Sequence, residues 1–130
     1  MAPPTFIISD ISQGLLVACK AETSKKLTLL YSNSGAGGSI GPEVFSEMIT
    51  QIQEEYKKAQ IIAILDCGSE AGTALSAIRQ GIPNIHFTLS HEKKLKITQI
   101  AKANGTQIFN APINGINLNE TKNVEELIKL

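Results

Sequence analysis

Residues 26–43, with the sequence KLTLLYSNSGAGGSIGPE, join an apolar segment to a glycine-rich turn and the start of a helix. The apolar segment 26–32 predicts a strand that is buried on both faces. Pro42 suits the first position of a helix, and Glu43 is favourable near the positive end of the helix dipole. Apolar side chains then recur at helical spacing, which predicts a helix to about Lys58. The stretch therefore predicts a strand–turn–helix unit of an α/β fold.

The same alternation continues along the chain. The patterns predict further strands at 61–66, 84–89 and 107–110, and helices from Asp10 as N-cap to about Glu22, from Ala71 to Gly81, and from Ser90 to Asn104-Gly105.

The two ends of the sequence are less regular. Residues 1–9 are predicted as an N-terminal arm, in which Phe6-Ile7-Ile8 forms a small strand or a hydrophobic clasp. Residues 111–119 are predicted as a loop. Asn123 and Glu126 have the spacing of a capping box, which predicts the start of a short last helix.

Strands that alternate with helices favour right-handed βαβ units and a mainly parallel sheet. We therefore predict a single α/β domain over residues 1–130, with the loop and C-terminal helix at 111–130. The expected fold is a three-layer sandwich, Rossmann-like or flavodoxin-like, with helices flanking a mainly parallel four-stranded sheet. The arm at 1–9 adds an N-terminal strand as an option. By analogy with doubly wound sheets, the predicted strand order is 2-1-3-4, counted from the strand at 26–32.

Composition excludes several classes of protein. The chain has 130 residues, and its hydrophobic fraction of 42% is too high for a disordered protein. Its 12 Lys and Arg balance 12 Asp and Glu, so we expect no nucleic-acid partner. The two cysteines form no CxxC pair, which favours reduced thiols in the cytoplasm. The N-terminal residues do not resemble a signal peptide, and the longest apolar run, 61–65, is far below the roughly 20 residues that span a bilayer. We therefore expect a cytoplasmic protein with no membrane partner.

The glycine-rich turn is the main candidate site. Ligands of open parallel sheets bind beyond the carboxyl ends of the strands, and glycine amides together with a helix N-terminus attract anions. The predicted ligand-binding residues are Ser34, Gly35, Gly37, Gly38, Ser39 and Gly41, with Asp66 and Ser69 nearby. The alternative is that this turn, and the capping of the next helix by Asp66 or Ser69, is purely structural.

Cys67 is the second candidate. It is predicted to lie between a strand end and a helix N-terminus, where the pKa of a thiol can fall and create a reactive nucleophile. His86 or His91 is then the candidate base. The alternative is a small packing residue. Two histidines and two separated cysteines lack the spacing of a metal site, so we expect no bound metal.

Several local sequences resemble known families. Residues 34–41, SGAGGSIG, are similar to the glycine-rich turn of short-chain dehydrogenases, Ser32-Asn33-Ser34-Gly35 to the phosphate loop of flavodoxins, and Ile40 to Val44 to the helix start of isocitrate-type dehydrogenases. Residues 29–42 together with 65–81 resemble a group of small bacterial α/β proteins to which no activity is attached. Residues 61–109 resemble the second half of a STAS domain, in which a serine at the helix start is phosphorylated; here the order is Asp66-Cys67-Gly68-Ser69.

Two functions of different classes remain open. The first is binding of an anionic or phosphorylated small molecule at the glycine-rich turn. The second is a non-catalytic, STAS-like interaction module that forms homo-oligomers through the arm at Phe6-Ile7-Ile8 or the tail at Leu127, Ile128 and Leu130. The sequence leaves open whether the protein is an enzyme, and it identifies no cofactor.

Overall fold

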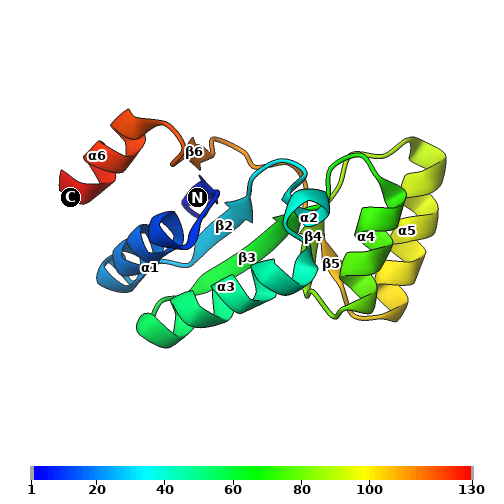
Figure 1. Cartoon of the computed structure of the whole chain (residues 1–130), viewed down its shortest axis with the longest axis horizontal. Helices are drawn as coiled ribbons and strands as arrows, with labels where there is room; N and C mark the ends of the chain where they lie inside the picture. Colours follow the sequence, from blue (N-terminus) through cyan, green and yellow to red (C-terminus); the bar gives the residue numbers. More distant parts are fainter. Residues whose placement is uncertain (1, 130) are drawn as a thin grey trace. The chain divides into compact units, whose positions relative to one another are not determined.

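The computed structural model describes residues 2–129 (Figure 1). Its helices and strands alternate along most of the chain. They are β1 (Thr5–Ile8), α1 (Ile11–Ser24), β2 (Thr28–Ser32), α2 (Ala36–Ser39), α3 (Pro42–Glu55), β3 (Ile61–Asp66), α4 (Ala71–Arg79), β4 (Asn84–His86), α5 (His91–Ala103), β5 (Gln107–Ile108), β6 (Ile116–Asn117) and α6 (Thr121–Lys129).

The strands belong to one sheet in the order β5-β4-β3-β2-β1-β6, and every pairing given for it is parallel. The predicted α/β class, with a mainly parallel sheet flanked by helices, is therefore confirmed. The sheet has six strands in the described chain rather than four. The predicted order 2-1-3-4 is wrong, because the strands from β1 to β5 pair with their neighbours along the chain and the order does not reverse among them.

The chain divides into two compact units. Unit 1 contains the residues up to Asn33, Glu47–Ala63 and those from Pro112 onward; unit 2 contains Ser34–Ser46 and Ile64–Ala111. Strand β3 contributes its first half to unit 1 and its second half to unit 2.

In unit 1, β1 lies between β2 and β6, with Phe6 opposite Leu30 and Ile116. Because side chains alternate along a strand, Phe6, Ile8 and Leu30 share one face of the sheet. These three form a buried cluster with side chains of the neighbouring elements. The cluster also contains Val17 of α1 and Leu118, and Met48, Ile49, Ile61, Val124 and Leu127 pack against it.

The N-terminal arm is a central strand of unit 1 rather than an external clasp. Phe6 is 6% exposed and Ile8 is fully buried. Two further expectations for unit 1 are wrong. The segment predicted as a loop at 111–119 contains β6, and the last helix begins at Thr121, so Asn123 is not its N-cap. Asn123 Nδ2 instead donates to the carbonyl of Asn117 at 2.9 Å.

Unit 2 contains the end of β3 followed by α4, β4, α5 and β5. Leu65 lies opposite Ile85, and Ile85 lies opposite Ile108. The two crossovers run in the same direction along the sheet, so their right-handedness places α4 and α5 on the same face. The two helices pack against one another (Figure 1).

The structure also corrects two predictions about helices. The short helix α2 lies inside the segment predicted as a simple turn. Helix α3 ends at Glu55 rather than near Lys58. The Gln53 side-chain amide donates to the carbonyls of Tyr56 at 3.0 Å and Ala59 at 2.9 Å, which satisfies backbone acceptors just beyond the helix end.

Candidate functional site

Two turns of unit 2 approach one another around the Asp66 carboxylate. Its Oδ1 accepts a hydrogen bond from the Gly35 amide at 3.2 Å and another from the Gly68 amide at 2.9 Å. Asp66 ends β3 and is buried. The protein therefore supplies its own carboxylate to the glycine-rich turn, at an amide where the sequence predicted a ligand anion.

Glycine is required where these turns meet. Gly35 and Gly68 have φ angles of +73° and +68°, the left-handed region that side chains disfavour. A Cβ at Gly68 would lie 3.2 Å from the Gly35 Cα, and a Cβ at Gly37 would lie 3.2 Å from the Cys67 Cα. The glycines at 37 and 68 thus serve close packing against backbone, whereas Gly35 serves the left-handed φ of the turn.

Several other backbone amides of the glycine-rich turn donate hydrogen bonds to carbonyls of the same turn. The amides of Gly38 and Ser39 donate to the Gly35 carbonyl, and the Ile40 amide donates to the Ala36 carbonyl. These bonds build α2 and reduce the number of amides that can face a ligand. The predicted cluster of anion-binding amides over 34–41 is therefore only partly available.

A cavity of about 350 Å³ lies between the two turns and the start of α4. Five of the predicted residues line it: Ser34, Gly35, Gly38, Cys67 and Ser69. The lining also includes Gly68, Glu70, Thr73 and Thr88, which the sequence analysis did not select. Gly37, Ser39, Gly41 and Asp66 are not among the lining residues. Hydroxyl groups of serine and threonine dominate its polar side chains.

Backbone amides without partners lie just before and at the start of α4, and two of the residues that carry them, Ser69 and Glu70, line this cavity. Within the part of the chain that the structure describes, the amides of residues 69–72 have no hydrogen-bond partner. The N-cap residue Glu70 makes no side-chain capping bond, so neither Asp66 nor Ser69 caps this helix. Such N-terminal amides carry partial positive charge. Glu70 is exposed and lines the same cavity, and no Lys or Arg is among the described lining residues.

The surroundings of Cys67 oppose a nucleophilic role. The side chain is 2% exposed, and burial, followed by the nearby Asp66 charge, raises the pKa of Cys67 to about 12. The thiol is therefore protonated at neutral pH. The candidate base His86 is engaged elsewhere, because its Nδ1 lies 2.8 Å from the Phe109 carbonyl, which can only accept a hydrogen bond. His91 is exposed at the start of α5.

In unit 1, polar side chains at or just after the ends of the strands β1, β2 and β6 bond to one another. Asn119 Nδ2 donates to Asn33 Oδ1 at 2.8 Å and to Asn117 Oδ1 at 2.7 Å, and the Ser9 hydroxyl donates to Asn119 Oδ1. Asp10 caps α1 as predicted, with its carboxylate accepting from the Gln13 amide at 2.9 Å. These groups bond to one another, and we place no ligand site here.

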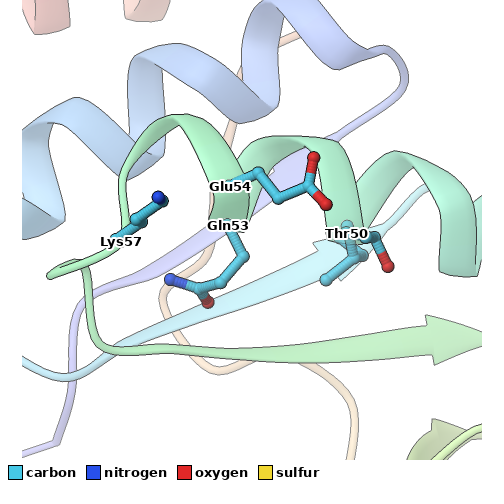
Figure 2. Close-up of a pocket in the computed structure, with 5 residues that line it drawn as sticks. Thr50, Gln53, Glu54 and Lys57 are labelled. Atoms are coloured by element: carbon cyan, nitrogen blue, oxygen red, sulfur yellow. The ribbon is translucent and has the colours of Figure 1, made fainter.

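A second hollow, of about 470 Å³, lies along α3 in unit 1 (Figure 2). Its lining residues are Ile49, Thr50, Gln53 and Glu54 of this helix and Lys57 just after its end. Figure 2 shows Thr50, Gln53 and Glu54 spread along the helix, with Lys57 beyond its end. The Gln53 amide already bonds to the backbone after α3. The unit 2 cavity is lined by residues of several separate segments, whereas this hollow is lined by one continuous segment of the chain.

Comparison with protein-family models finds no match, and no curated protein has a significantly similar sequence. The resemblances drawn from local motifs therefore stay predictions. Within residues 2–129, no three metal-ligating side chains gather into a group, and none of the helices is long and apolar enough to cross a membrane.

Proposed function

We propose that the unit 2 cavity binds a small molecule through an anionic group such as a phosphate. The observation that carries this proposal is the set of unpartnered amides at residues 69–72, which open α4 beside the cavity. Donors at a helix N-terminus stabilise negative charge without a basic side chain. The hydroxyls of Ser34, Ser69 and Thr73 supply further donors for the oxygen atoms of the ligand.

Within this proposal, Asp66 is a positioning residue. Its carboxylate holds the Gly35 and Gly68 amides together and so shapes the cavity wall. Glu70 lowers the affinity for an anion, because this acidic residue is among those that line the cavity. The proposed site therefore binds an anion less tightly than it would without the Glu70 carboxylate.

Thermal unfolding with inorganic phosphate, pyrophosphate and a panel of sugar phosphates and nucleotides tests the proposal. A ligand that binds the folded protein raises Tm saturably. The variant Glu70→Gln removes the repelling charge, and we expect it to bind the same ligand about fivefold more tightly. Glu92→Gln is the matched control, since Glu92 is exposed in the first turn of α5 and does not line the cavity.

The proposal fails if no compound gives a saturable rise in Tm with either the unmodified protein or Glu70→Gln. It also fails if Glu92→Gln alters the affinity as much as Glu70→Gln does. A lower affinity for the same anion in Glu70→Gln would contradict the repulsion assigned to Glu70.

The alternative function, a homo-oligomeric interaction module, has less support. Phe6 and Ile8 are buried in β1, and Leu127 packs against the unit 1 core. Leu130 and the side chain of Ile128 lie outside the described residues. The alternative stays a prediction, and native mass spectrometry of the purified protein reports its subunit count.

A further inference from the structure

The sequence contains two Asn-Gly pairs, Asn104-Gly105 and Asn114-Gly115, in different structural settings. We infer that Asn114 is a site of spontaneous deamidation and that the fold protects Asn104 from the same reaction. This inference is independent of the cavity in unit 2.

The reaction needs only the protein and water. The backbone nitrogen of the following residue attacks the side-chain Cγ of asparagine, loses its proton to the solvent, and forms a five-membered succinimide while ammonia leaves. Water then opens the ring at either carbonyl to give aspartate or isoaspartate. Glycine favours the attack because it has no side chain to hinder its nitrogen. The reaction is therefore fastest where the backbone nitrogen of the glycine and the side-chain nitrogen of the asparagine make no hydrogen bond, and where the asparagine side chain can rotate.

Asn104 is fixed at the end of α5. Its Nδ2 donates to the Ile100 carbonyl at 2.8 Å, and its backbone amide donates to the carbonyls of Ile100 and Ala101. The attacking nitrogen, that of Gly105, donates to the Lys102 carbonyl at 3.3 Å. Attack at Asn104 therefore requires that the helix end opens first.

Asn114 lies in the connection before β6 and is exposed, as is Gly115. Among residues 2–129, neither its side chain nor the Gly115 amide has a hydrogen-bond partner. The neighbouring Ile113 is 71% exposed, whereas the Gly115 backbone packs against Ile7 and Pro112, so exposure and the lack of hydrogen bonds, rather than the lack of packing, distinguish this site. Asn114 has a φ of +54°, a conformation that asparagine tolerates better than most residues. Unlike Asn104 and Gly105, the Asn114 side chain and the Gly115 amide have, within the described chain, no hydrogen bond that must break before the Gly115 nitrogen attacks.

The test is incubation of the folded protein at mildly alkaline pH, followed by chymotryptic peptide mapping with fragment-ion mass spectrometry. Chymotrypsin cleaves after Phe109 and so separates the two sites. We expect Asn114 to convert about tenfold faster than Asn104 or more, because Asn104 must first break at least two hydrogen bonds. In urea both pairs lose their structure, and the ratio is expected to approach one.

Two variants assign the sites. Asn114→Gln requires a larger ring and removes the fast conversion, whereas Asn104→Gln leaves it unchanged. Equal rates in the folded protein, faster conversion at Asn104, or conversion of both sites only in urea would each overturn the inference.

Discussion

Asp66 holds the two glycine turns of unit 2 together through its hydrogen bonds to the Gly35 and Gly68 amides. Asp66→Ala leaves both amides without their acceptor, so we expect the free energy of unfolding to fall by about 1–3 kcal/mol. Asp66→Asn keeps an oxygen acceptor and loses less. Urea unfolding of the three proteins measures the difference. Equal stability of Asp66→Ala and the unmodified protein would contradict the role assigned to this carboxylate.

Cys67 illustrates how burial sets the chemistry of a single side chain. With a pKa of about 12, it holds its proton throughout the neutral range and becomes a thiolate only as the pH rises toward 12. Cys19 is exposed. We expect iodoacetamide at pH 7–8 to label Cys19 and to leave Cys67 unlabelled until the protein unfolds, as read by mass spectrometry. Labelling of Cys67 as fast as Cys19 in the folded protein would restore the reactive-thiol hypothesis.

At the scale of elements, Gly14 explains the close packing of α1. Glycine disfavours a helix interior, yet Gly14 lies within α1. A Cβ there would overlap the Ile52 Cδ1 of α3 and would lie 3.2 Å from the Ile8 Cδ1 of β1. The absent side chain therefore allows α1 to approach both elements in the unit 1 core.

Gly14→Ala is expected to destabilise the protein by about 1–2 kcal/mol, because overpacking outweighs the better helix propensity of alanine. Gly72→Ala is the matched control, since it lies in α4 and its Cβ would meet nothing within 4 Å. Chemical denaturation of both variants decides between packing and propensity. If Gly14→Ala stabilises the protein as Gly72→Ala should, the packing argument is wrong.

Helices and strands with a clear local sequence pattern were predicted, and those without one were missed. The helices starting at Pro42, Ala71 and His91 were predicted from residues that favour helix starts and from apolar periodicity. The strand β6 was missed because its two residues are too short for a periodic pattern. It forms through pairing with β1, a long-range contact that no local sequence reveals.

At the scale of the whole molecule, the α/β class was predictable and the strand order was not. Alternating strands and helices indicate parallel βαβ units, but they do not say on which side of its predecessor a strand adds. The arm was predicted either as a small strand or as a hydrophobic clasp, and the pairing of β1 with β2 and β6 and the burial of Phe6 and Ile8 confirm the strand.

The candidate site was predicted only in part, because local sequence locates its turns but not the long-range contacts between them. The turns that carry Ser34, Cys67 and Ser69 were located from glycines after buried strands, and all three residues line the cavity. Asp66 was predicted at the site, but as a residue that contacts the ligand. Its hydrogen bond to Gly35 joins residues 31 positions apart, and no local pattern indicates such a bond. Thr88 was not selected, since it falls inside the strand predicted at 84–89, whereas β4 ends at His86.

A titration of the isotope-labelled protein with inorganic phosphate, followed by NMR of the backbone amides, tests the proposed anion site most directly. We expect saturable shifts concentrated at residues 69–72 and larger in Glu70→Gln, while amides around the polar cluster of Ser9 and Asn119 stay unchanged. Absence of a saturable shift at residues 69–72, or shifts of similar size across the whole surface, would contradict the proposed anion site.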